Sequence, residues 1–129
     1  MDLTTTMKKR RSIREYTGEL PTEEEINKIL EAAYLAPTFG FHNMQMSVIT
    51  KSELLKEAEE NAEKFLKTKA TSYMYNAPVW IIISAKKHTQ NIPNTPYTAE
   101  MVNGNMYWTL GSILQNMHLK ATELGLAAC

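Results

Sequence analysis

The chain has 129 residues, a mass of 14.7 kDa, and fourteen basic and fourteen acidic side chains. This length excludes two full domains, and we expect one domain over residues 1–129. A composition of 43% hydrophobic and 22% charged residues excludes collagen-like, low-complexity and wholly disordered chains. Because the formal net charge is zero, no overall field attracts nucleic acid or an anionic membrane, and any electrostatic function must be local.

Cysteine content and hydropathy indicate the compartment. Cys129 is the only cysteine, which excludes an internal disulfide and suits a reducing cytoplasm. The first twelve residues lack the apolar core of a signal peptide. The longest apolar run, 77–83, contains Pro78 and is far shorter than the roughly 20 residues that span a bilayer. We therefore expect a cytoplasmic protein without a membrane segment.

A capping box begins the first element that the sequence predicts. Thr22 precedes Glu25 by three residues, so each side chain can bond to the other residue's amide. Apolar residues then follow at steps of three and four until Pro37, which disfavours helical angles in the residue before it. The pattern predicts a helix at about 22–35.

The middle of the chain alternates between strand and helix patterns. Residues 44–49 are typical of a short strand. Ser52 can cap a helix whose apolar residues lie opposite its glutamates, namely Leu55, Ala58, Ala62, Phe65 and Leu66. Residues 79–84 are apolar except for Ser84, which predicts a strand covered on both faces and central in a sheet.

The last predicted element is a long helix that begins at about Tyr97 and ends at Gly125, a residue suited to a left-handed C-cap. It carries apolar side chains beyond one stripe, including Trp108. This pattern indicates either burial inside the domain or contact with another subunit. Helices that alternate with strands predict an α/β or α+β sandwich.

Four polar residues near the start of the chain are candidates for binding phosphate. Three guanidinium groups and a hydroxyl occur within five residues, from Arg10, Arg11, Ser12 and Arg14. A guanidinium group can donate two parallel hydrogen bonds to the oxygens of one phosphate. A solvated basic face and a nucleic-acid contact are alternatives for the same residues. Base-stacking aromatic residues are missing nearby apart from Tyr16, which disfavours nucleic acid.

The loop at 36–45 is a second candidate, because loops between helices and strands often carry binding groups. Thr38, Asn43 and Gln45 offer donors and acceptors, and Phe39 and Phe41 could cover a planar ring. A plain connection between the helix and the strand is the alternative.

Hydrolytic and metal chemistry are both disfavoured. No Ser/His/Asp or paired-carboxylate arrangement is visible, so no catalytic side chain is assigned. His42, His88 and His118 are far apart and lack a carboxylate or cysteine at ligand spacing, so we expect no bound metal.

Taken together, these segments resemble the nitroreductase family. The resemblance rests on RRSIREY at 10–16, LEAAYLAPT and NMQ before the first strand, PVWIII at 78–83, and QNMHLKATELGLAAC at 115–129. It runs from Met7 to Cys129. It implies an α+β nitroreductase-like sandwich, a central sheet flanked by helices, in a homodimer. It also implies an FMN-dependent oxidoreductase that transfers hydride from NAD(P)H to nitroaromatic, quinone or flavin-type acceptors.

The resemblance also implies roles for individual residues. Arg10, Arg11, Ser12 and Arg14 would hold the FMN phosphate and ribityl chain. The loop of the partner subunit would line the flavin with Pro37, Thr38, Phe39 and Asn43. Gln45 is a further candidate for binding the cofactor. Since FMN itself carries out the redox chemistry, the absence of a catalytic triad is compatible with this function.

The chain departs from the family pattern in three places. The loop is about two residues longer around 40–42, and Met46 and Ser47 stand where the family has a proline–aromatic pair. The chain is also shorter than family members usually are, and 125–129 is typical of the beginning of a strand. We therefore expect a domain incomplete at its C-terminal end. A catalytically idle flavin-binding or dimerisation module is the alternative function.

Overall fold

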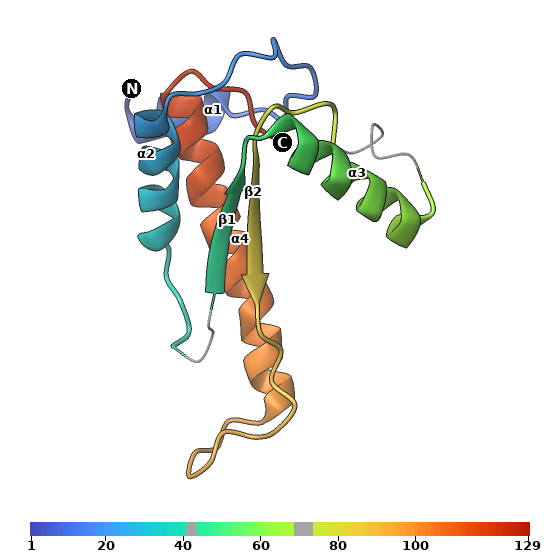
Figure 1. Cartoon of the computed structure of the whole chain (residues 1–129). Coiled ribbons are helices and arrows are strands. Elements are labelled where there is room, and N and C mark those ends of the chain that lie inside the picture. The colour runs from blue at the N-terminus through green and yellow to red at the C-terminus, as the bar shows by residue number, and fades with distance from the viewer. Residues whose placement is uncertain (41–43, 69–73) are drawn as a thin grey trace.

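The computed structural model describes residues 1–40, 44–68 and 74–129. Four helices and two strands occur in these ranges (Figure 1). They are α1 (Leu3–Lys9), α2 (Glu23–Tyr34), β1 (Met44–Ile49), α3 (Ser52–Leu66), β2 (Trp80–Ala85) and α4 (Ala99–Glu123). The predicted α+β class is confirmed. The helices expected at about 22–35, from Ser52 and from about Tyr97, and the strands expected at 44–49 and 79–84, are found within about two residues of their expected bounds.

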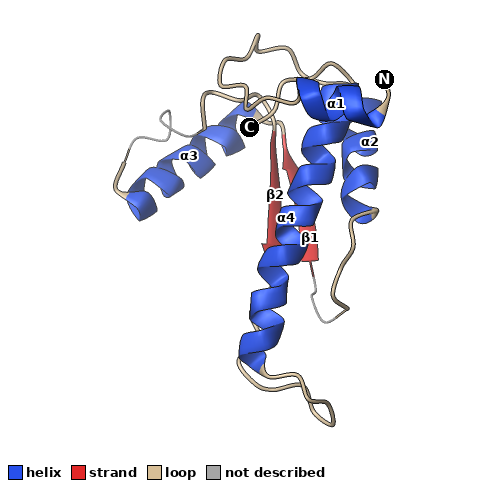
Figure 2. Cartoon of the chain, turned by 180° about the vertical axis from the view of Figure 1, so that it is seen from behind, coloured by secondary structure: helices blue, strands red, loops and turns tan. Residues whose placement is uncertain are grey.

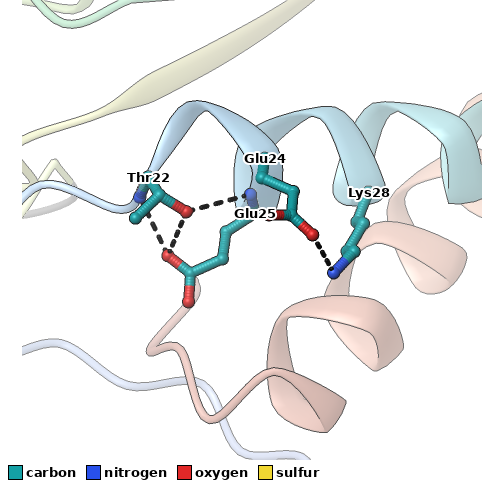
Figure 3. Close-up of polar contacts among 4 residues, drawn as sticks. All are labelled: Thr22, Glu24, Glu25 and Lys28. Atoms are coloured by element: carbon teal, nitrogen blue, oxygen red, sulfur yellow. Dashed lines mark hydrogen bonds and ion pairs between the residues drawn. The ribbon is translucent and has the colours of Figure 1, made fainter.

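The N-terminus of α2 is fixed by the predicted capping box (Figure 3). The Thr22 hydroxyl oxygen accepts a hydrogen bond from the Glu25 amide at 3.2 Å, and the Glu25 carboxylate accepts one from the Thr22 amide at 2.8 Å. One turn along the helix, Lys28 pairs with Glu24 at 2.7 Å. Both interactions are local, which is why the sequence alone predicts where this helix begins.

Helix α1 is a short element that the periodicity analysis does not predict. Asp2 caps it by accepting a hydrogen bond from the Thr5 amide at 3.0 Å. Seven residues are too few for an apolar repeat to emerge, so the capping aspartate is the one local signal of this helix.

The two strands pair in antiparallel register, with Met46 opposite Ile83 and Met44 opposite Ala85. Because side chains alternate along a strand, Met44, Met46, Ile81 and Ile83 all point to one face. These four pack against a buried cluster from α2 and α4 that comprises Ile29, Ala33, Ala36, Ile113, Met117 and Ala121. The core therefore lies between the sheet and one pair of helices (Figures 1 and 2).

The expectation that residues 79–84 form a strand covered on both faces is not met. In the described part of the chain both α2 and α4 lie against the same face of the sheet, and Ile82 on the opposite face is 41% exposed. A continuous apolar run measures how apolar a strand is, and it does not report which neighbours are present to cover it.

Helix α4 has one face in the core and one face in solvent. The inner face is buried at Val102, Met106, Thr109, Ile113, Met117 and Ala121. On the outer face Met101, Tyr107 and Leu114 are exposed, and Trp108 is 81% exposed. Burial inside the chain therefore leaves part of the apolar surface of this helix exposed.

Helix α3 projects away from the sheet (Figures 1 and 2). Of its residues, all of which the structure describes, none is buried, and Phe65 on its apolar side is 85% exposed. Residues 125–129, where we expected the beginning of a strand, form no strand in the described structure, although the carbonyl of Ala128 accepts a hydrogen bond from the amide of Ile13 at 3.0 Å. Within the described ranges, no helix has both the length and the apolar character that crossing a bilayer needs.

Candidate functional site

The basic segment leaves the C-terminal end of α1. The Arg10 amide donates to the carbonyl of Thr6 at 2.9 Å and ends the helix, and the residue is half-buried. Arg11 is exposed, and its Nη1 donates to the carbonyls of Lys8 and Arg10 at 2.7 and 2.8 Å. Ser12 is exposed in the loop that follows. The segment thus presents two guanidinium groups and a hydroxyl on one short, externally placed loop, with Arg14 two residues further on.

Arg14 is the member of this segment with a long-range contact. Its Nε donates to the phenolic oxygen of Tyr75 at 3.1 Å, and its guanidinium carbon lies 5.6 Å from the centre of the Tyr75 ring. The hydrogen bond to Tyr75, helped by the nearby Cys129 thiol, raises the pKa of Arg14 above its already high value. Arg14 is therefore a permanent cation near neutral pH, with its orientation fixed from a segment 61 residues away.

A cavity of about 720 Å³ adjoins this contact. Its apolar wall is formed by α2, β2 and α4, for example by Ile29, Ile81 and Met117. Tyr75 and Cys129, the two residues that interact with Arg14, also line it. Arg14 itself is not one of the lining residues, but it contacts Tyr75, which is.

Tyr16 and His118 are lining residues of this cavity whose pKa is shifted by burial. Tyr16 donates its hydroxyl to the carbonyl of Ile13 at 3.0 Å, and burial raises the pKa of Tyr16. Burial lowers the pKa of His118, and the cation of Arg10 adds to that effect. His118 is therefore held toward its neutral form, while Arg10 is close enough to influence it electrostatically.

The second predicted set lies in the loop after α2. Pro37 and Thr38 are exposed, and Phe39 is half-buried because its ring meets the ring of Tyr97 edge to face. The Phe39 amide also donates to the hydroxyl of the buried Thr109 at 3.5 Å. The loop is thus attached to α4, and two of its predicted binding residues point into solvent.

The remaining two predicted residues are placed less completely. Gln45 is exposed in β1 and pairs with Ser84 of β2 in the sheet register. Asn43 lies outside the described residues, so its predicted role stays a prediction. The same holds for Phe41.

The structure does not bring the two predicted sets together within one chain. The basic segment lies at the end where α2 begins, and the loop at 36–40 lies at the end where α2 stops (Figure 1). At about 1.5 Å per residue, the twelve residues of α2 alone separate the two ends by about 18 Å. Within one chain the two sets therefore lie at opposite ends of α2.

Sequence reasoning missed Tyr75 and the cavity. Tyr75 lies far from Arg14 in sequence, and only the folding of 74–85 against the N-terminal loop brings the two together. One signal was present: Tyr75 is followed by Asn76 and Pro78, a composition typical of a turn. Within the described ranges, no three side chains among His, Cys, Asp and Glu are grouped as metal ligands.

Comparison with known families decides the identity of the fold. A profile of the nitroreductase family matches residues 7–129. The chain belongs to the nitroreductase family. This match covers the basic segment, the loop after α2 and the whole of α4, which are the parts that carried the resemblance in the sequence.

Solved structures of other nitroreductases share the fold. The chain is 25% identical to a Bacteroides fragilis nitroreductase with bound FMN; all of this chain matches 68% of that one, with a TM-score of 0.71. It is 26% identical to a Desulfitobacterium hafniense nitroreductase with bound FMN, where 98% of this chain matches 68% of that one, with a TM-score of 0.70. It is 30% identical to an FMN-dependent nitroreductase of Clostridium difficile R20291, where 96% of this chain matches 62% of that one, with a TM-score of 0.67.

The chain spans about three-fifths to two-thirds of the length of these nitroreductases. A comparison with curated protein sequences gives no match.

The family profile and the solved structures thus establish the family and the fold, and the activity is inferred from the site.

Proposed function

We propose that this nitroreductase is an FMN-dependent oxidoreductase that works as a homodimer in the cytoplasm. It takes hydride from NAD(P)H and passes it to nitroaromatic, quinone or flavin-type acceptors. The observation that carries the proposal is the separation of the two predicted residue sets at opposite ends of one chain, because a shared site between two copies accounts for it.

The donors of the basic segment fit the phosphate of FMN. Arg10, Arg11 and Arg14 supply permanent cations, and Ser12 adds a hydroxyl that can donate a hydrogen bond. Arg11 and Arg14 are exposed, so binding an anion there requires no unfolding. Two of the similar nitroreductases contain FMN, which supports the same cofactor here.

When bound, FMN supplies the hydride chemistry, and the protein binds and orients it. The basic segment would hold the phosphate and ribityl chain of the cofactor. The partner's loop would border the flavin ring through Pro37, Thr38, Phe39 and Asn43, with Gln45 at the start of the sheet beside them. No side chain is required to act as a nucleophile.

The outer face of α4 is the surface that we assign to the contact between the two copies. Met101, Tyr107, Trp108 and Leu114 form an exposed apolar face on a helix whose other face is already in the core. Apolar faces of this kind favour association in water. We expect Trp108→Glu to convert the dimer to a monomer in light scattering. Phe65→Glu, on the equally exposed α3, is the control and should leave the mass unchanged.

Cofactor loading tests the function directly. Protein saturated with FMN and passed through gel filtration should retain flavin absorbance and oxidise NAD(P)H with a quinone or nitroaromatic acceptor. Retained flavin without turnover would favour the catalytically idle flavin-binding or dimerisation module. If the protein shows no flavin absorbance and no turnover, the proposal is refuted.

Mixing variants tests the shared site. Arg10→Ala with Arg14→Ala disables the phosphate half, and Thr38→Ala with Asn43→Ala disables the loop half. If each site takes one half from each copy, a heterodimer of the two variants contains one intact site, so mixing two inactive proteins should restore turnover. If both halves of a site came from one copy, no mixture would be active.

A further inference from the structure

We propose that Tyr75 is a positioning residue of the cofactor site, which orients Arg14 so that its terminal nitrogens face the phosphate of FMN. This inference rests on the proposed function. It adds a residue that lies outside both predicted sets and that comes from the turn before β2.

The geometry of the contact carries the inference. A guanidinium group has five N–H donors in a plane, and the Arg14 Nε–H is used by the phenolic oxygen of Tyr75 at 3.1 Å. The centre of the Tyr75 ring is 5.6 Å from the central carbon of the same group, so a cation–π contact accompanies the hydrogen bond. With Nε on Tyr75, the edge formed by the two terminal nitrogens is the edge that an anion would meet.

The backbone supports a defined role for this side chain. Tyr75 and Asn76 both have φ of +54°, in the left-handed region that bulky residues rarely adopt. Such conformations persist where surrounding contacts determine them, and they are frequent at binding sites. Two consecutive residues in this conformation make a tight turn that places the Tyr75 ring over the N-terminal loop.

Fixing Arg14 before the ligand arrives lowers the cost of binding. An exposed arginine side chain loses rotamer freedom when it grips a phosphate, and a preformed contact removes part of that loss. The other exposed guanidinium of the segment is held in a similar way, since Arg11 donates to two backbone carbonyls. We therefore expect Tyr75 to affect binding of the phosphate and to leave the flavin ring unaffected.

The test compares FMN with riboflavin, which lacks the phosphate. Tyr75→Phe keeps the ring and removes the hydroxyl, so Kd for FMN should rise about three- to tenfold while Kd for riboflavin stays unchanged. Tyr75→Leu removes the ring as well and should weaken FMN binding further. Tyr16→Phe is the matched control, because it removes a phenolic hydroxyl from the same cavity that bonds to the Ile13 carbonyl and not to Arg14. Kd for FMN should stay unchanged in this variant.

A double-mutant cycle separates positioning from stability. In protein that already carries Arg14→Ala, Tyr75→Phe should cause no further loss of FMN affinity, because the group that it orients is gone. Equal losses of affinity for FMN and riboflavin, or additive losses of FMN affinity in the cycle, would overturn the role of Tyr75 and leave the proposed function standing. If wild-type protein binds no FMN, the proposed function fails and this inference fails with it. Wild-type binding of FMN with either of the variant results above would instead refute only the role of Tyr75.

Discussion

Phe39 and Tyr97 meet edge to face, with ring centres 5.2 Å apart and ring planes at 84°. This contact joins the loop after α2 to the segment that leads into α4, and the bond from the Phe39 amide to Thr109 ties the same loop to α4 itself. The loop proposed to reach the partner's flavin is therefore held by the helix that we assign to the dimer contact.

The Phe39–Tyr97 pair should contribute a measurable coupling energy. Edge-to-face aromatic pairs add about 0.5–1.5 kcal/mol beyond the burial of their surface. We expect a double-mutant cycle of Phe39→Leu and Tyr97→Leu, measured by urea unfolding, to give a coupling free energy in that range. A coupling near zero would show that each ring packs independently of the other.

Asn116 should stabilise the junction of α2 and α4. Its side-chain amide donates to the carbonyl of Ala32 at 3.1 Å, and that carbonyl is one of the last four of α2, which have no intrahelical donor. Asn116→Ala leaves this half-buried acceptor without its partner and should lower the free energy of unfolding by about 1–2 kcal/mol. Asn116→Asp should lower it more, because a carboxylate then faces a carbonyl oxygen.

Gln115 provides the control for Asn116. It precedes Asn116 on the same helix and is exposed, so Gln115→Ala should change the free energy of unfolding by less than about 0.5 kcal/mol. Equal losses at both positions would show that the effect at Asn116 comes from helix propensity.

The capping box should contribute most of the stability at the start of α2. Thr22→Ala removes the acceptor for the Glu25 amide and should cost about 1 kcal/mol in the free energy of unfolding. Thr22→Ser keeps the hydroxyl and should restore most of that loss. A serine variant as unstable as the alanine variant would show that the methyl group of Thr22 matters and the hydrogen bond does not.

The stability of the protein should fall at mildly acidic pH because of His118. Burial lowers the pKa of His118 in the folded chain, so the unfolded chain takes up this proton at a higher pH than the folded chain does. The contribution is fully present above the ordinary pKa of 6.5 and is lost as pH falls below it. Between about pH 7.5 and about pH 5.5, wild-type protein should lose more unfolding free energy than His118→Gln. Parallel losses in the two proteins would contradict this assignment.

Local signals in the sequence were sufficient for most of the secondary structure. The Thr22–Glu25 box and the apolar stripe of α2 involve residues within one or two turns, so the helix could be predicted from spacing alone. Residues 79–84 show the limit of such signals. Their apolar run predicts a strand correctly, but the exposure of Ile82 depends on which elements pack against β2.

The candidate site was predictable only where its residues are close in sequence. Arg10, Arg11, Ser12 and Arg14 form one short segment, and the nature of their side chains suggests an anion. Tyr75 could not be paired with Arg14, because no periodicity or motif connects residues 61 positions apart. The sequence spacing between the basic segment and the loop at 36–45 also does not show that the two lie at opposite ends of α2.

Helix α2 separates the two segments that we propose to bind FMN, so under that proposal its length is a functional dimension. Inserting one turn would shift the loop about 5 Å along the helix axis and rotate it little, whereas inserting two residues would turn it by more than half a revolution. Selection on such a spacer would constrain insertions and deletions in α2 far more strongly than substitutions on its exposed face.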